Sequence, residues 1–177
     1  MNQQEYIEFH KQTCDRAWAA ECAGEAVNVY GSESEALKYA FANYAREPTC
    51  AGFGGDLIAL AMWLAGCRTN EEATALAERC RQLSLRKNTD YADPDRNPGK
   101  FAIFRNFLRC ELLGICSVEA GILVRLSDKV SRCENLLARD TGPAVQDEKL
   151  ADTYQDLVNY TCLLLAYIKT KKEQGKV

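Results

Sequence analysis

The chain has 177 residues, a formal net charge of −3 and an apolar fraction of 47%. This length and composition predict one globular domain that buries a hydrophobic core. The acidic balance argues against a general DNA- or RNA-binding protein, which would carry a basic patch. The longest apolar run, residues 57–65, is far shorter than the roughly 20 residues that a membrane-spanning helix needs.

Nine cysteines are scattered along the chain, and no two of them form a CxxC pair. An odd number without regular spacing predicts reduced thiols, most of them buried, rather than a disulfide or zinc framework. The N-terminal stretch MNQQEYIEFH is polar and acidic and lacks a signal-peptide pattern. We therefore expect a cytoplasmic protein.

Apolar spacing in the N-terminal half predicts a helix at residues 3–21, which carries His10, the single histidine. One histidine without a second base gives no catalytic triad, so we predict a structural role for it. A break at residues 24–31 follows. Ser32-Glu33-Ser34-Glu35 then forms a capping box that starts a second helix, through residue 45.

The run Gly52-Phe53-Gly54-Gly55 precedes an apolar helix predicted at residues 56–65. A glycine-rich loop that opens a helix can cradle phosphate on its free N–H groups. Here no Lys-Ser/Thr follows the glycines and no strand precedes them, as a P-loop requires. We therefore interpret the run as a tight turn that lets a central helix pack closely.

The C-terminal half contains four further predicted helices. A second capping box at Thr69–Glu72, a helix-ending glycine at Gly114 and a helix cap at Ser117 set three of the boundaries. The stretch 86–100 holds two prolines and alternating charges, so we predict a long loop, and such loops often carry function. The four helices span residues 69–85, 101–113, 118–138 and 147–168. The fold class is all-α: a single-domain bundle of about seven helices with a long C-terminal helix.

The last predicted helix places Asp152, Asp156 and Asn159 on one side, four and three residues apart. Carboxylates at this spacing repel each other and favour a nearby cation. The preceding helix carries Arg125, Asp128 and Arg132 at matching spacing, and the short connection makes the two helices antiparallel neighbours. The two polar stripes can therefore face each other.

Two arrangements of these stripes are equally reasonable. In the first, the arginines neutralise the aspartates in a buried ion-pair network. In the second, Asp128, Asp152 and Asp156 hold Mg²⁺, while the arginines and Lys129 hold phosphate. Magnesium takes only one or two carboxylates in many nucleotide sites, so a full ring of ligands is not needed. Spacing alone does not decide between them.

Four motifs resemble a family found mostly in phages and prophages, the nucleotide-modification-associated domain of the first type. They are KNTDY at residues 87–91, FRNF at 104–107, RLSDKVSR at 125–132 and DEKLADTYQDLVNY at 147–160. The resemblance covers roughly residues 1–18 and 85–170. It implies a core at residues 1–23 and 85–170 and a helical insertion at 24–84. It also implies a phage-encoded protein, in the host cytoplasm, that acts on nucleotides.

The last two predicted helices are also distantly similar to the MazG-like all-α nucleotide pyrophosphohydrolases, which place acidic residues around Mg²⁺. The Glu-Glu-x-x-Glu helix of that family is missing here. The resemblances nevertheless imply Mg²⁺ as cofactor, and Asp128, Asp152 and Asp156 as its ligands and catalytic residues. They imply a phosphate- and ligand-binding set of Lys87, Asn88, Asp90, Tyr91, Arg125, Lys129, Arg132 and Asn159.

Three functions remain open at this point. The first is a Mg²⁺-dependent hydrolase acting on a nucleotide phosphate, with Asp90 or Glu148 orienting a water and Tyr91 stacking on a base. The second is a non-catalytic protein that sequesters a nucleotide signal of host antiviral defence, with residues 24–84 as a lid or specificity element. The third is an internal ion-pair network in a protein that acts through partners. By analogy with related all-α nucleotide enzymes, we expect a homo-oligomer.

Overall fold

The structure is a computed structural model that describes residues 1–20, 23–92, 102–138 and 149–175. In these ranges it contains eight α-helices, one 3₁₀ turn and no strand. The predicted all-α single-domain bundle is therefore confirmed. In the same ranges no helix has the length and apolar character needed to cross a membrane.

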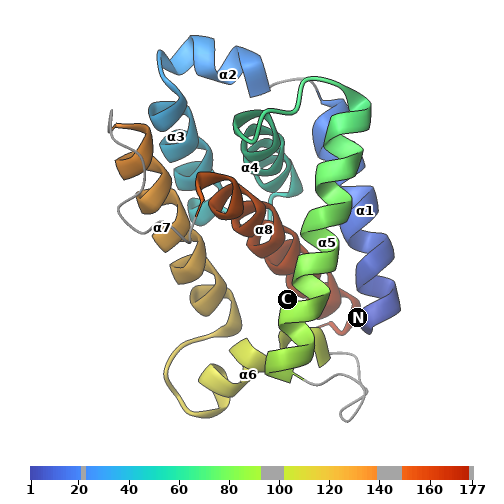
Figure 1. Cartoon of the computed structure of the whole chain (residues 1–177). Coiled ribbons are helices and arrows are strands. Elements are labelled where there is room, and N and C mark those ends of the chain that lie inside the picture. The colour runs from blue at the N-terminus through green and yellow to red at the C-terminus, as the bar shows by residue number, and fades with distance from the viewer. Residues whose placement is uncertain (21–22, 93–101, 139–148, 176–177) are drawn as a thin grey trace.

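The elements follow one another in a simple order along the chain (Figure 1). Their bounds are α1 Gln3–Ala19, α2 Ala23–Tyr30, α3 Glu33–Arg46, α4 Ala51–Leu64, α5 Asn70–Ala92, η1 Ala102–Phe104, α6 Arg105–Leu112, α7 Val118–Leu137 and α8 Leu150–Glu173.

Three predicted helix starts are confirmed by hydrogen bonds to the capping side chains. The Ser32 hydroxyl accepts from the Glu35 N–H at 3.2 Å, and the Ser117 hydroxyl accepts from the Ala120 N–H at 3.1 Å. Thr69 and Glu72 form a reciprocal pair, because the Glu72 N–H donates to Thr69 Oγ1 and the Thr69 N–H donates to Glu72 Oε2. Each cap satisfies N–H groups that a helix start leaves without a partner.

Three local predictions are wrong. Residues 24–31 are not a break: they form most of α2, since glycine occurs only near its ends. The loop predicted from residue 86 is helical through Ala92, because the prolines and glycine that indicated a loop lie beyond it. Helix α4 begins at Ala51, so the glycine run lies inside the helix rather than before it.

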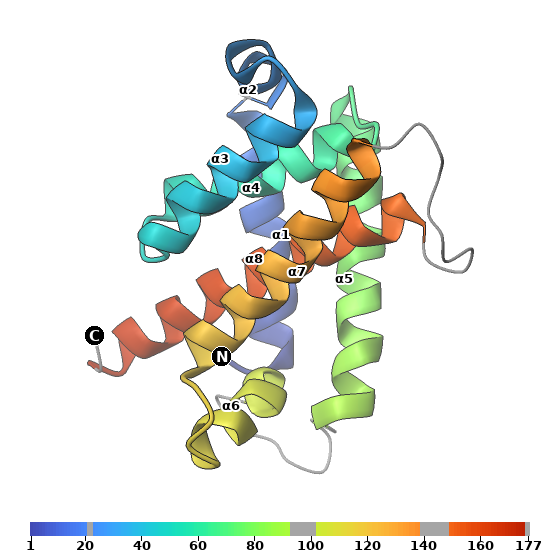
Figure 2. The same cartoon turned by 90° about the vertical axis from the view of Figure 1, so that its left-hand side faces the viewer.

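Helix α8 is the centre of the bundle. Helices α1, α4, α5 and α7 all pack against it, and Figures 1 and 2 show α7 running alongside it while α5 crosses it steeply. It buries residues around much of its circumference. A helix that is buried on most sides is stable only when neighbours surround it, and these four helices supply that surrounding.

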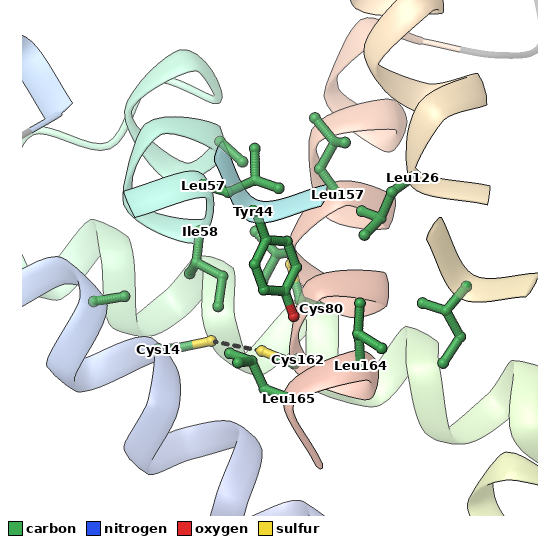
Figure 3. Close-up of a cluster of buried hydrophobic side chains, with 14 of the residues drawn as sticks. Cys14, Tyr44, Leu57, Ile58, Cys80, Leu126, Leu157, Cys162, Leu164 and Leu165 are labelled. Atoms are coloured by element: carbon green, nitrogen blue, oxygen red, sulfur yellow. Dashed lines mark hydrogen bonds between the residues drawn. The ribbon is translucent and has the colours of Figure 1, made fainter. Parts of the chain in front are cut away.

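Helix α4 reaches α8 closely because Gly54 carries no side chain. A Cβ atom built on Gly54 would lie 2.9 Å from Leu165 Cδ1, which is shorter than van der Waals contact. Leu57 and Ile58 from α4 and Leu164 and Leu165 from α8 form part of one apolar cluster (Figure 3). Residues 24–84 therefore supply a helix to the central core, which does not fit the predicted role of this segment as a lid.

Candidate functional site

A pocket opens where α5, η1 and α6 meet the first half of α8, with Tyr6 of α1 at its base. It encloses about 90 Å³, which is less than the roughly 300–1,000 Å³ of most small-molecule sites. Its wall is mixed: Leu85, Ile103, Phe107 and Leu163 are apolar, whereas the remaining residues carry hydroxyl, amide or charged groups. Such a pocket admits one part of a polar ligand and leaves the rest at the mouth.

Asp156 is the buried charge of this pocket, and two lysines from different helices neutralise it. Lys87 Nζ from α5 lies 2.6 Å from Asp156 Oδ1, and Lys129 Nζ from α7 lies 3.0 Å from Oδ2. The Lys129 side chain is 17% exposed and that of Lys87 45%. A buried carboxylate needs such partners because removal from water disfavours its charge. Lys87 therefore links the ion pair to the open part of the pocket.

Two amide groups in the pocket wall have hydrogen atoms to donate but no acceptor. Nδ2 of Asn88 and Nδ2 of Asn159 are both buried and without a hydrogen-bond partner. The other side of the Asn159 amide is fixed, because its Oδ1 lies 3.1 Å from His10 Nε2. Buried polar groups are nearly always satisfied in folded proteins. An acceptor bound in the pocket would satisfy both donors.

An aromatic corner closes the pocket beside these amides. The rings of Phe107 and Tyr160 meet edge to face, with centroids 6.3 Å apart. The Arg125 guanidinium lies over the outer side of Tyr160, 5.9 Å from the ring centre. Its hydrogen bond with Tyr160 raises the pKa of Arg125 above its usual range, so this group stays cationic. The corner offers a flat apolar surface next to a fixed positive charge.

The three predicted Mg²⁺ ligands lie in different surroundings. Asp152 is exposed at the start of α8, where it accepts a hydrogen bond from the Lys149 N–H at 3.3 Å. Asp128 is exposed on α7 and pairs with Arg125 of the same helix at 3.5 Å. Only Asp156 lines the pocket. The three carboxylates do not converge, and Mg²⁺ binding stays a prediction.

The cross-helix ion pairs also differ from those predicted. Lysines, rather than Arg125 and Arg132, hold Asp156, because Lys129 is the residue of α7 that faces α8 at this level. Arg125 turns to Tyr160 and Asp128, and Arg132 is half-buried further along α7. The predicted Asp90 is exposed near the end of α5. Tyr91 is the penultimate residue of α5, and Glu148 lies outside the described residues.

Sequence reasoning missed a buried group next to the pocket: His10 and Cys14 of α1 and Cys162 of α8. In the described ranges it is the one set of three or more His, Cys, Asp or Glu side chains whose ligand atoms all lie within 4.8 Å of one another. The spacing of His10 and Cys14, one helical turn apart, is visible in the sequence. Their partner lies near the other end of the chain, and no local pattern reveals it.

The two thiols of this group differ in acidity. The hydrogen bond with Cys162, together with the contact with His10, lowers the pKa of Cys14 to about 6. Burial raises the pKa of Cys162 well above its usual range. None of the eight described cysteines forms a disulfide, and five of them are buried.

The pocket also contains residues that the motifs did not indicate. Tyr6 and Ser84 line its base, where Tyr6 Oη lies 3.3 Å from Ser84 Oγ. Asn106 lines it from α6. It lies in the FRNF motif, but we did not predict it to bind a ligand, although that motif could have identified it.

Comparisons with known proteins give no relative: no family model matches the chain, and no curated protein or solved structure matches it. The resemblance to the phage nucleotide-modification-associated domain therefore stays a prediction. What the protein does must be argued from the pocket.

Proposed function

We propose that the protein binds a nucleotide in this pocket and holds it without turning it over. One observation carries the proposal: Asn88 and Asn159, which line the pocket together with Lys87, each carry a buried amide donor without a partner. Phosphate oxygens and the edges of bases are strong acceptors for such groups. A ligand that accepts from both amides removes the cost of two buried donors without partners.

The charge of the pocket fits a phosphate-bearing ligand. Lys87 is held by Asp156 at one side and is still 45% exposed, so it can contact an anion while it keeps its buried partner. Lys129 balances the second oxygen of Asp156, so the two lysines and one aspartate leave a net positive charge. The carboxylate therefore orients the lysines instead of repelling the ligand.

The aromatic corner fits the other half of a nucleotide. Phe107 and Tyr160 line the pocket, and a base stacked on an aromatic side chain gains about 1–3 kcal/mol. The enclosed volume of about 90 Å³ is too small for a whole nucleotide. We expect one end, base or phosphate, to enter while the other lies across the mouth towards Arg125.

The positions of the motifs give independent support. All four motifs that resemble the phage family supply a residue to the pocket or to its ion pairs. These are Lys87 and Asn88, Asn106 and Phe107, Lys129, and Asp156, Asn159 and Tyr160. They come from four separate segments of the chain. Convergence of motif residues on one pocket is expected when the motifs serve a shared ligand.

Binding without turnover fits the carboxylates better than hydrolysis does. A Mg²⁺ site that cleaves a phosphate needs carboxylate oxygens free to coordinate the ion. Asp156 instead gives one oxygen to each lysine, and Asp128 and Asp152 are exposed elsewhere. A protein that only holds its ligand can sequester a nucleotide signal, such as one produced in host antiviral defence. The experiment below also tests the alternative, a Mg²⁺-dependent hydrolase, by looking for a product formed only when Mg²⁺ is present.

The test is a binding screen on the full chain. Mono-, di- and triphosphates and cyclic dinucleotides are added with and without Mg²⁺, and melting temperature and calorimetric heats are measured. A ligand that binds the folded state raises the melting temperature. We expect Asn88→Ala to weaken binding by about tenfold to a hundredfold, since a hydrogen bond to a charged group contributes about 1.5–3 kcal/mol. Asn28→Ala, on the exposed face of α2, is the matched control and should bind normally.

The bound ligand is then released by heat and analysed. Recovery of the intact nucleotide supports holding, whereas recovery of a product formed only with Mg²⁺ supports the hydrolase. If no nucleotide in the panel shifts the melting temperature or produces heat, the proposed function is wrong. The homo-oligomer stays a prediction, which light scattering on the same samples checks.

A further inference from the structure

The buried group of His10, Cys14 and Cys162 lies behind the pocket, between α1 and α8. His10 and Cys162 are 0% exposed and Cys14 is 1% exposed. Cys14 Sγ lies 3.6 Å from His10 Nδ1 and 3.8 Å from Cys162 Sγ. Figure 3 shows the two thiols pointing towards each other across the gap between their helices.

These distances are those of a zinc site. Zinc–sulfur bonds of about 2.3 Å and zinc–nitrogen bonds of about 2.0–2.1 Å place two thiolates about 3.8 Å apart in a tetrahedron, and an imidazole nitrogen about 3.5 Å from a thiolate. The observed separations of 3.8 Å and 3.6 Å match both edges. A metal ion can therefore enter without moving the three ligand atoms far.

We propose that His10 Nδ1, Cys14 Sγ and Cys162 Sγ bind one Zn²⁺ ion, with a water as the fourth ligand. Binding removes the S–H protons of both cysteines, and these two protons leave to solvent. One Zn²⁺ and two thiolates are together neutral, and the histidine contributes only its lone pair. A neutral cluster avoids the large cost of burying a net charge.

The partner of the second ring nitrogen supports this assignment. His10 Nε2 lies 3.1 Å from Asn159 Oδ1, and an oxygen at this position selects the tautomer in which Nε2 carries the proton and donates it. The Nδ1 lone pair then faces the two sulfurs. Metal-binding histidines almost always donate their other N–H to an oxygen in this way, which fixes the ring.

The Tyr44 hydroxyl, near the cluster, has no hydrogen-bond partner. Tyr44 is fully buried, and in Figure 3 its hydroxyl points in the direction of Cys162. Cys162 also contributes to the raised pKa of Tyr44, which is consistent with their proximity. A metal-bound water next to Cys162 would satisfy this hydroxyl.

Zinc and water can approach the cluster through a second cavity, which shares no lining residue with the nucleotide pocket. This cavity of about 240 Å³ lies between α1 and α5, and Cys14 is one of its lining residues together with Trp18 and Asn70. A metal ion entering there meets Cys14 first. It does not need to pass through the pocket that contains Lys87 and Asp156.

The test is a cobalt titration of the reduced, metal-free full chain. Cobalt replaces zinc in such sites and reports them by absorption, with thiolate-to-metal charge-transfer bands and the intense visible bands of tetrahedral coordination. We expect one equivalent of Co²⁺ to bind and one equivalent of Zn²⁺ to displace it. The wild-type titration decides by itself: a folded, reduced chain that binds neither metal overturns the proposal.

Variants locate the ion. Cys162→Ser should remove the charge-transfer bands or reduce them strongly, whereas Cys133→Ser should leave them unchanged, because Cys133 is a buried thiol of α7 outside the group. Circular dichroism checks that each variant is folded. If Cys162→Ser does not fold, His10→Asn with the same absorption readout replaces it. Bands of undiminished intensity in a folded Cys162→Ser variant, or an unchanged Co²⁺ affinity and unchanged visible bands in His10→Asn, place the metal elsewhere and overturn the proposal.

Neither proposal depends on the other. Metal content and cobalt absorption are measured without a nucleotide, and nucleotide binding is measured by calorimetry on the same preparation. Loss of nucleotide binding after removal of Zn²⁺ would show that the ion fixes Asn159 through His10. The effect of Zn²⁺ on nucleotide binding does not decide whether Zn²⁺ binds; the cobalt titration alone decides that.

Discussion

The two halves of α8 are both buried but make different kinds of contact. In the first half, Asp156 and Asn159 lie beside the pocket, held by lysines and a histidine, with one amide hydrogen-bond donor left over. In the second half, Leu164 and Leu165 pack in the apolar cluster that α4 helps to form. Burial alone therefore does not distinguish a structural residue from a functional one.

What distinguishes the halves is whether their buried polar groups have partners. At its contact with α4, the apolar half packs so closely that Gly54 has no room for a methyl group beside Leu165. The polar half leaves donors without acceptors and a partly exposed lysine. Close packing stabilises the fold. A buried polar group without a partner destabilises it, and such groups are found where a ligand or another group supplies the missing hydrogen bond. Substitutions in the two halves should therefore have different consequences.

The largest effect on stability is expected in the apolar half. Leu164→Ala removes a side chain that is 0% exposed and should lower the free energy of unfolding by about 3 kcal/mol, within the usual range for buried leucines. Leu112→Ala is the matched control, since Leu112 is 87% exposed, and should change it by less than about 0.5 kcal/mol. Urea unfolding measures both. Equal effects would mean that α8 is not the centre of the core.

A smaller loss is expected when the ion pairs of the polar half are broken. Asp156→Asn keeps the shape of the side chain but leaves Lys87 and Lys129 without their anion. Since Lys87 is half exposed and can be solvated, we expect a loss of about 1–2 kcal/mol, below the 3–5 kcal/mol of a fully buried pair.

The control for this substitution is Asp128→Asn. Asp128 forms an exposed pair with Arg125, and such pairs contribute about 0–1 kcal/mol. If Asp128→Asn proves as damaging as Asp156→Asn, the distinction between the buried and the exposed carboxylate is wrong.

The close contact between α4 and α8 gives a third comparison, between two glycines of one helix. Gly54→Ala forces Leu165 to move, whereas a Cβ atom at Gly52 meets nothing closer than Cys50 Sγ at 3.7 Å. Alanine favours the helix at both positions, so the difference isolates the contact. We expect Gly54→Ala to be less stable than Gly52→Ala by about 1–2 kcal/mol. Thermal unfolding of the two variants measures this, and a reversed order would contradict the packing.

Local patterns were enough to predict most of the fold. Helix α7 begins and ends within one residue of its prediction, and the caps at Ser32, Thr69 and Ser117 act as expected. Periodicity and capping depend on neighbours in sequence, and these are visible without a structure. The C-terminal end of α5 was predicted too early. The loop assigned from the prolines was extended back to residue 86, whereas the helix continues to Ala92.

Part of the pocket and of its ion pairs was named from the sequence, but their arrangement was not predicted. Lys87, Asn88, Lys129, Asp156 and Asn159 were all named from the motifs. Helical spacing shows that residues share a face but not how far each side chain reaches across to another helix. Sequence therefore grouped Asp152 with Asp156, placed arginines where lysines lie, and missed the contact of His10 and Cys14 with Cys162.

The smallest effect is expected for Asp152, the residue that sequence reasoning placed at the centre of a Mg²⁺ site. It is exposed, and among the described residues the hydrogen bond that its side chain makes is with the Lys149 N–H at the start of its own helix, at 3.3 Å. Asp152→Asn keeps an acceptor at that position and removes a charge that favours the helix start, which is worth about 0.3–1 kcal/mol.

We therefore expect a change in unfolding free energy of about 0.5 kcal/mol for Asp152→Asn, and unchanged nucleotide binding. Urea unfolding and calorimetry on one preparation measure both, with Asp156→Asn as the comparison four residues along the helix. A loss of several kcal/mol, or loss of Mg²⁺-dependent binding, would return Asp152 to the site. It would also show that the first turn of α8, rather than the turn containing Asp156 and Asn159, contacts the ligand.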